Sequence, residues 1–178
     1  MRIIAGSAKG TRLKTASKGT RPMTGRARES LFSIIAGYLP AAEVLDLYAG
    51  SGSLGLEGLS RGAASAVFVE HGREAAGILT ENVEAVGLGG TVVVRDVSAA
   101  LSSMHQLFDV VFVDPPYADD DAHVESVLAK LDRLLAPDGL IVVHRQARSA
   151  FGVPDFLTST DERRYGDAVI TMLERTVA

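Results

Sequence analysis

Short apolar runs and stretches of helical periodicity alternate along the middle of the chain. The apolar runs predict buried strands, which cover residues 44–48, 66–70, 91–95, 108–113 and 140–144. Helical spacing between these runs predicts helices, which cover approximately residues 54–60, 73–86, 98–104 and 121–135. Because strands separated by helices form βαβ units, this pattern predicts a parallel sheet with right-handed crossovers.

The two ends of the chain depart from this alternation. Near the C-terminus, strand-like runs at 156–164 and 168–174 are separated by a short turn, which predicts an antiparallel hairpin at the sheet edge. At the N-terminus, residues 2–5 and 11–14 predict a small β-hairpin joined through a glycine-containing turn. A polar segment follows, and Thr24 is suited to cap the helix that begins after it.

The whole pattern predicts an α/β protein with a mostly parallel seven-stranded sheet, an antiparallel C-terminal edge hairpin and a small N-terminal β-hairpin extension. A length of 178 residues is enough for one domain with a buried core and a short appendage. We therefore expect a hairpin extension over residues 1–20 and one domain over residues 21–178. The content of 47% hydrophobic and 22% charged residues is ordinary for a soluble globular protein.

The strand predicted over residues 108–113 stops at the sequence Asp114-Pro115-Pro116-Tyr117. Each proline fixes its own φ and keeps the residue before it extended, so a stiff loop presents Asp114 and Tyr117. Neither proline has an N–H group, which leaves this loop rich in hydrogen-bond acceptors. Acceptors beside an aromatic ring suit a planar ligand that carries an exocyclic amino group. The structural alternative is a strand-ending turn with a surface aspartate.

Polar residues also follow the other predicted strands. The first strand continues into a turn with glycines at positions 50, 52 and 55, which lets a ligand approach the backbone and the start of a helix. The second strand ends at Glu70, placed to accept from ribose hydroxyls, and the third at Asp96, placed to accept from an adenine amino group. Parallel sheets bind ligands beyond the carboxyl ends of their strands, so we expect these groups at one edge. Taken singly, each has a structural alternative: a plain turn, a strand-capping carboxylate and a helix cap.

The composition argues against several classes of protein. The chain contains no cysteine, which excludes disulfides, thiolate zinc sites and a cysteine nucleophile. Its histidines lack metal-ligand spacing, so we expect no metal; they are His71, His105, His123 and His144. There is no apolar run of membrane-spanning length and no signal-peptide pattern, so we expect no membrane association and a cytoplasmic location.

The net charge of −4 conceals a strong asymmetry. Residues 1–28 contain eight basic and no acidic residues, whereas the rest of the chain carries a net charge of −12. A basic segment on an acidic body predicts a surface for a polyanion, most plausibly nucleic acid; the alternative is a solvated N-terminal tail. The candidates for nucleic-acid contacts are Arg2, Lys9, Arg12, Lys14, Arg21, Arg26 and Arg28.

Three separated motifs resemble a known family. The sequence VLDLYAGSGSLGLE (residues 44–57), together with Asp114-Pro115-Pro116-Tyr117, resembles class I S-adenosylmethionine-dependent methyltransferases that act on amino groups. Upstream, RPMTGRARESLF (residues 21–32) and the opening RIIAG (residues 2–6) resemble the RsmD family. Members of that family methylate N2 of the guanine conventionally numbered 966 in 16S ribosomal RNA. The resemblance extends over nearly the whole chain.

This resemblance implies a Rossmann-like class I methyltransferase fold, S-adenosyl-L-methionine as cofactor, and 16S ribosomal RNA in the small ribosomal subunit or its assembly intermediate as partner. The cofactor-binding residues that it implies are Asp46, Tyr48, Ala49, Gly50, Ser51, Gly52, Leu54, Glu70 and Asp96. The implied catalytic residues are Asp114, Pro115, Pro116 and Tyr117. The chain departs from the family pattern at Ala27, where a larger aliphatic residue is usual, and at Ser33, where asparagine is usual. The C-terminal hairpin also matches the family pattern weakly. These departures bear on helix packing rather than on chemistry.

Other functions stay open at this point. The same cofactor would serve a DNA adenine-N6 or a protein glutamine methyltransferase, although a long target-recognition insert is missing. The glycine-rich turn and Glu70 would also suit an NAD-dependent oxidoreductase, which leaves Asp114-Pro115-Pro116-Tyr117 unexplained. A non-catalytic RNA-binding assembly factor with a retained methyltransferase fold is the third alternative. We expect the chain to act as a monomer.

Overall fold

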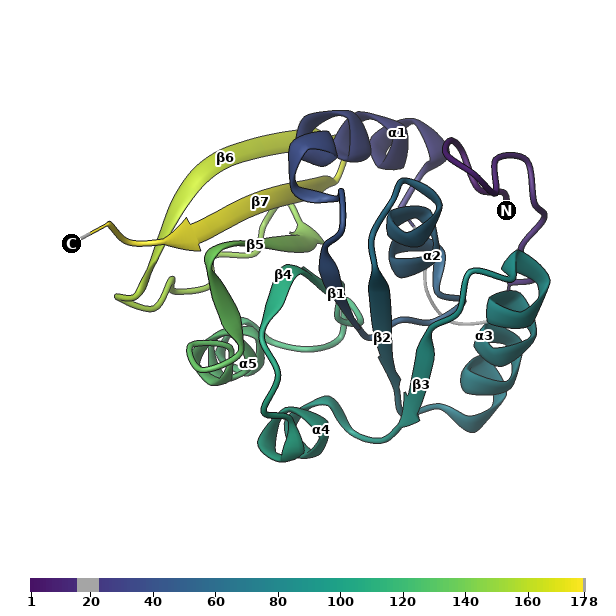
Figure 1. The fold of residues 1–178 in the computed structure, drawn as a ribbon. Helices are drawn as coiled ribbons and strands as arrows, with labels where there is room; N and C mark the ends of the chain where they lie inside the picture. Colours follow the sequence, from purple (N-terminus) through teal and green to yellow (C-terminus); the bar gives the residue numbers. More distant parts are fainter. Residues whose placement is uncertain (16–22, 178) are drawn as a thin grey trace.

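The computed structural model describes residues 1–15 and 23–177, whose strands form a seven-stranded sheet. The strands are β1 (Glu43–Leu47), β2 (Ser65–Glu70), β3 (Thr91–Val94), β4 (Phe108–Val113), β5 (Leu135–Gln146), β6 (Leu157–Tyr165) and β7 (Ala168–Arg175). Their order is β3-β2-β1-β4-β5-β7-β6, and all neighbours are parallel except β5–β7 and β7–β6 (Figure 1). This confirms the predicted fold class, including the antiparallel hairpin at the C-terminal edge.

Helices cover both faces of the sheet. They are α1 (Gly25–Ile34), a 3-10 turn η1 (Ile35–Tyr38), α2 (Ser53–Ser60), α3 (Arg73–Val86), α4 (Val97–Ser103) and α5 (Asp121–Lys130). Successive strand residues point to opposite faces. Val44 and Phe112 therefore belong to the core beneath α1, α2 and α3, whereas Leu45 and Val111 belong to the core beneath α4 and α5.

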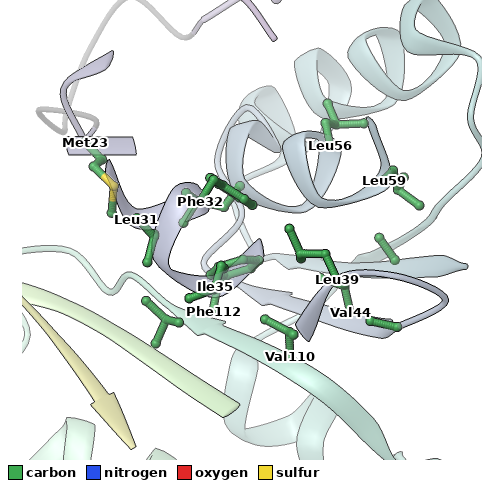
Figure 2. Packing of buried hydrophobic residues seen from close by; sticks show 14 of the residues in the cluster. Met23, Leu31, Phe32, Ile35, Leu39, Val44, Leu56, Leu59, Val110 and Phe112 are labelled. Atoms are coloured by element: carbon green, nitrogen blue, oxygen red, sulfur yellow. The ribbon is translucent and has the colours of Figure 1, made fainter. Parts of the chain in front are cut away.

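The end of α1 and the 3-10 turn after it are built into the first of these cores (Figure 2). Phe32 of α1 and Phe112 of β4 lie with ring centroids 5.6 Å apart. Ile35 of η1 and Leu56 of α2 pack in the same cluster, and all four side chains are fully buried. Burial of aromatic and aliphatic groups of this size is a major stabilising contribution. It fixes α1 relative to β4, the strand that leads to the Pro-Pro loop.

The largest departure from the predicted boundaries lies between α5 and β5. The helix expected over 121–135 ends at Lys130, and β5 begins at Leu135, earlier than predicted. The apolar residues beyond Lys130 continue a helical pattern, which is why periodicity extended the helix through them. In the structure the N–H groups of Leu134 and Leu135 both donate to the Leu131 carbonyl, and this tight turn leads directly into the strand.

The N-terminal hairpin is held by one antiparallel bridge, Arg2 with Arg12, and not by the two strands that we predicted. The Ile3 N–H donates to the Thr11 carbonyl at 3.0 Å. Ile3 and Leu13 are buried in the same core as α1. The described part of this segment is therefore packed on the sheet domain, which contradicts the alternative of a solvated tail for these residues.

Glu57 of α2 fastens the hairpin to the domain. Its fully buried carboxylate accepts the N–H groups of Ile4 and Ala5 at 2.8 and 3.0 Å. The same carboxylate accepts Nε of Arg61 at 2.8 Å. A buried carboxylate requires such donors, because an unpaired charge in the interior is strongly destabilising.

Replacing Glu57 with alanine is therefore expected to lower the free energy of unfolding by about 3 kcal/mol, because buried donors lose their acceptor. Urea denaturation measures this change, and amide exchange at Ile4 and Ala5 should accelerate more than exchange in β1. Glu81→Ala is the control, since the side chain of Glu81 forms an exposed pair with Lys14 of the same hairpin. The control is expected to change stability by less than about 0.5 kcal/mol. Equal losses in both variants would contradict this role of Glu57.

Candidate active site

The polar residues predicted to act together follow strands whose carboxyl ends are in register at one edge of the sheet. Leu47 of β1 is paired with Val69 of β2 and with Val113 of β4. Glu70 and Asp114 therefore leave the sheet on either side of the turn that follows β1. The chain order reverses between β1 and β4, and this switch point is where parallel α/β sheets bind their ligands.

The turn after β1 requires glycine at two positions. Gly50 and Gly52 have φ angles of 55° and 79°, in the left-handed region that other residues rarely adopt. A Cβ atom on Gly52 would lie 2.4 Å from Cδ1 of Leu79. Gly52 is the N-cap of α2, so the turn delivers the chain directly to a helix N-terminus. Backbone N–H groups at such a terminus suit a ligand carboxylate or phosphate.

Glu70 holds this turn in place. One of its carboxylate oxygens accepts the Gly50 N–H at 2.9 Å, and the other accepts the Gly72 N–H at 2.7 Å. A carboxylate has about four lone-pair sites, so each oxygen retains capacity for a second donor. Glu70 is thus fixed beside the glycine turn with acceptor capacity for ligand hydroxyls.

Asp46 lies inside the turn and not on its surface. It is 1% exposed, and its carboxylate accepts the Gly55 N–H in the first turn of α2 at 2.8 Å. Burial raises the pKa of Asp46 well above its ordinary value. The Gly55 hydrogen bond opposes this effect, and the charges of Asp114 and Glu70 add to it. The resemblance places Asp46 among the cofactor-binding residues; in the structure its carboxylate contacts the backbone that follows the turn.

Replacing Asp46 with asparagine is expected to change how the free energy of unfolding depends on pH. The pKa of Asp46 is higher in the folded protein than in the unfolded chain, so the folded protein binds this proton more tightly. The free energy of unfolding therefore falls as pH rises from the unfolded-state pKa towards the folded-state pKa. Asparagine accepts the Gly55 N–H without titrating. The variant should therefore gain stability relative to the native protein as pH rises from about 4. Urea denaturation of both proteins between about pH 4 and 8 tests this; a difference that stays constant with pH would contradict it.

Asp96 acts as the N-cap of α4. Its carboxylate accepts the Ala99 N–H at 3.0 Å, so the helix-cap interpretation of this residue is confirmed. Asp96 is nevertheless exposed, and it follows β3 beside Glu70, which is paired with Val94. One carboxylate oxygen forms the cap, and the exposed group is accessible from the same edge of the sheet.

The remaining residues of the predicted cofactor set contact neighbouring elements of the fold. Tyr48 has a left-handed φ of 59°, which ends β1 one residue earlier than predicted, and its hydroxyl lies 2.7 Å from Nε2 of His123. Burial raises the pKa of Tyr48. The Ala49 N–H donates to the backbone of β2, and the Ser51 carbonyl accepts a side-chain amide from α3. Leu54 is buried in the core. These contacts hold the backbone of the turn rigidly.

His144, which sequence reasoning did not single out, is the partner of Asp114. Its Nδ1 lies 2.8 Å from Oδ1 of Asp114, and the imidazole is only 4% exposed. The ring centroids of His144 and Tyr117 are 6.3 Å apart. Val113 is paired with Val143, so Asp114 and His144 follow aligned residues of neighbouring strands. That register is the signal that identifies the pair, and it requires knowing that β4 lies beside β5.

Arg145 is a second missed residue, and it holds the Pro-Pro loop. Its guanidinium is buried and donates to the Pro116 carbonyl at 3.0 Å and to the Asp119 carbonyl at 2.5 Å. The Asp119 N–H also donates to the Pro116 carbonyl. A planar guanidinium that spans two carbonyls restrains the loop between them. Asp121 lies 3.8 Å from the same group.

A pocket of about 930 Å³ opens beside Tyr117 and His144. Its walls come from the beginning of α1, the loop after β4, the turn after β5 and the turn between β6 and β7. The lining residues include Met23, Ala27, Arg148, Arg164 and Asp167. The pocket therefore borders the Asp114 loop and is roomy enough for a nucleotide.

Five of the seven basic residues predicted to bind nucleic acid are exposed: Arg2, Lys9, Arg12, Lys14 and Arg26. Arg21 lies outside the described residues. Arg28 was a candidate for a nucleic-acid contact, but the accessible side chain that this requires is not what the structure shows. The N-terminal hairpin covers Arg28, whose Nη2 donates to the Arg2 carbonyl.

Arg28 is only 2% exposed, and its Nε and Nη1 have no hydrogen-bond partner among the described residues. Burial lowers the pKa of Arg28, although the charge of Glu57 opposes this effect. A side chain in this position cannot reach a phosphate unless the hairpin moves. The hydrogen bond that its guanidinium donates goes to the backbone of the hairpin.

Residues 1–15 and 23–177 contain no helix with the length and apolar character that a membrane crossing needs. Within the same ranges, no group of three or more His, Cys, Asp or Glu side chains is arranged to hold a metal ion. Two of the histidines have other partners at the site: His123 contacts Tyr48, and His144 contacts Asp114.

The sheet order, the glycine turn after β1 and the acidic Pro-Pro loop after β4 together define a class I methyltransferase fold. A model of the family described as "Conserved hypothetical protein 95" matches residues 1–174. The chain belongs to this family, the RsmD family, in agreement with the resemblance of its motifs.

Individual relatives agree with this assignment. The ribosomal RNA small subunit methyltransferase D of Escherichia coli (strain K12) is 37% identical over 158 residues, which cover 86% of this chain and 78% of the relative. The Haemophilus influenzae protein of the same name is 33% identical over 172 residues, covering 93% and 89%. Among solved structures, "Putative methyltransferase yhhF from Escherichia coli" has a TM-score of 0.89 at 34% identity and covers 98% of this chain and 97% of its own.

Proposed function

We propose that this protein transfers a methyl group from S-adenosyl-L-methionine to N2 of the guanine at position 966 in 16S ribosomal RNA. The observation that carries the proposal is the adjacency of two elements: the glycine turn follows β1, the Asp114 loop follows β4, and Leu47 and Val113 are paired immediately before them. A donor and an acceptor bound at these two elements would meet at the edge of the sheet. The names of the related proteins support ribosomal RNA of the small subunit as the substrate.

The residues around the glycine turn fit the cofactor. The backbone at Gly50 and Gly52 and the start of α2 would receive its amino-acid end, and Glu70 would accept from its ribose. Among the described residues other than its chain neighbours, the nearest atom to the position of a Cβ on Gly50 is the Tyr48 carbonyl oxygen at 3.9 Å, so the backbone is open to close approach there. Asp96 would accept from the adenine amino group. When bound, the cofactor supplies a methyl group activated by a sulfonium.

The Asp114 loop would activate the acceptor nitrogen. The lone pair of a guanine amino group is delocalised into the ring, so two acceptors are needed to draw the nitrogen towards tetrahedral geometry. Asp114 and the carbonyl of Pro115 would accept its two N–H groups, whereas the Pro116 carbonyl already accepts from Arg145 and Asp119. As the bond between the nitrogen and the methyl carbon forms, the bond between that carbon and the cofactor sulfur would break and leave a neutral thioether. The proton released by the nitrogen would pass to Asp114 or water.

The pocket beside Tyr117 would hold the base during this step. An aromatic ring stacks on any base, and enzymes that modify a base take it out of its helical stack. The exposed basic residues of the N-terminal segment would contact backbone phosphates. In this proposal, residues 1–20 form an RNA-contacting extension of the methyltransferase domain over residues 21–178. The chain acts as a monomer in the cytoplasm, where small subunits are assembled.

Methyl transfer to small ribosomal subunits tests the proposal directly. Subunits from a strain that lacks the modification are incubated with the protein and labelled S-adenosylmethionine, and the labelled nucleoside is identified after digestion. We expect N2-methylguanosine at one position of 16S ribosomal RNA. Label in N6-methyladenosine or in protein would favour an alternative acceptor. Cofactor binding without transfer would favour the non-catalytic assembly factor.

A further inference from the structure

Two arginines outside the N-terminal basic segment line the pocket beside Tyr117. Arg148 lies in the turn after β5, and Arg164 lies near the end of β6. Both are exposed, and within the described part of the chain neither forms an ion pair. Two positive charges without a carboxylate partner therefore border the space next to the Asp114 loop.

The backbone that carries these arginines is fixed to the rest of the site. The Tyr165 hydroxyl donates to Oγ of Ser30 at 2.7 Å and joins the end of β6 to α1. The Ala147 N–H donates to the Asp167 carbonyl at 2.8 Å and joins the turn after β5 to the β6–β7 turn. Figure 1 shows this end of the hairpin beside α1. The backbone that carries the two arginines is thus fixed, and this lowers the entropic cost of binding a ligand.

The charge and size of the pocket suit an RNA strand. Asp167 is the only acidic residue among the lining residues described, against the guanidinium groups of Arg148 and Arg164. A guanidinium binds phosphate oxygens through paired N–H donors. The volume of about 930 Å³ lies near the upper end of ligand pockets, which leaves room for phosphates beside a base stacked on Tyr117.

We propose that Arg148 and Arg164 bind the RNA phosphates that flank the target nucleotide, so that the C-terminal hairpin is a second RNA-contacting element. This inference rests on the proposed function, which puts the target base against Tyr117. The phosphate contacts position the strand, and the base contacts are left to the Asp114 loop. Each guanidinium that neutralises a phosphate releases counterions and contributes to the salt dependence of binding.

Equilibrium binding of labelled 16S ribosomal RNA tests this proposal, with Arg148→Gln, Arg164→Gln and the double variant compared with the native protein. One phosphate contact contributes about 0.7 to 0.9 to the slope of log affinity against log salt. Removing it should weaken binding about five- to eightfold at about 0.1 M salt and reduce the slope by that amount. The double variant should lose about 25- to 60-fold.

Arg163→Gln is the matched control. Arg163 is the neighbour of Arg164 on β6, points to the other face of the hairpin and pairs with Asp161 at 3.0 Å. Its removal should leave both affinity and slope near their native values. A native salt slope in the Arg148 and Arg164 variants, or an equal loss in the control, would overturn the proposal. Binding is measured without turnover, so failure of methyl transfer in the native protein would count against the proposed function and not against this inference.

Discussion

Replacing Asp114 with asparagine is expected to lower kcat for methyl transfer by about a thousandfold, while the Kd for S-adenosylmethionine changes less than about threefold. Asparagine keeps the shape of the side chain and one acceptor oxygen, but it cannot take up the proton that leaves the amino group. It also presents an N–H donor where either His144 or the substrate requires an acceptor. Single-turnover transfer to subunits lacking the modification, together with calorimetric cofactor binding, measures the two effects separately.

The matched control for this prediction lies on β4, the strand that leads to Asp114. Asp109, near the amino end of β4, accepts the Glu43 N–H at 2.8 Å, far from the Pro-Pro loop. Asp109→Asn makes the same change of charge and should leave kcat within about twofold of the native value. The assigned role of Asp114 is wrong if its asparagine variant transfers methyl groups at the native rate. Parallel loss of cofactor affinity would assign the residue to the cofactor instead.

The parts of the site that local sequence predicted share a common physical basis. Apolar runs alternating with helical stretches fix the βαβ order, and in a parallel sheet that order places every strand's carboxyl end at the same edge. This order predicts that Glu70 and Asp114 share one edge with the glycine turn. That Asp114 lies directly beside the turn depends on the pairing of β4 with β1, which the order along the chain does not give. Prolines and glycines act on their own backbone, so the stiff loop after β4 and the tight turn after β1 were also predictable.

The missed residues depend on contacts that no local pattern records. His144 reaches Asp114 only because Val143 pairs with Val113, and Arg145 reaches the same loop across that pair of strands. Arg28 was predicted to be accessible, but a distant segment of the chain covers it. It lies three, four and seven residues before the buried Leu31, Phe32 and Ile35, so its position is on the buried face of α1. The hairpin that covers it includes Arg2, which is 26 residues earlier in the chain. The periodicity of a single helix does not predict which distant segment will pack over it.

Replacing Arg145 with methionine is expected to reduce kcat for methyl transfer about a hundredfold, with cofactor affinity largely retained. The buried guanidinium restrains the loop through the carbonyls of Pro116 and Asp119, and methionine fills similar space without donors. A displacement of about 1 Å at Asp114 is enough to produce a loss of this size. Amide exchange over residues 117–121 should accelerate, because the restraint on that segment is gone.

Arg175→Met separates this local effect from a general loss of stability. Arg175 donates to the Leu135 carbonyl at 2.9 Å and pairs with Asp132, so it holds the opposite end of β5 in a comparable way. Both variants should lower the free energy of unfolding by about 1–3 kcal/mol, since each removes hydrogen bonds from a guanidinium to backbone carbonyls. Only the Arg145 variant should lose turnover. If the two variants lost turnover equally, Arg145 would stabilise the fold without positioning the catalytic loop.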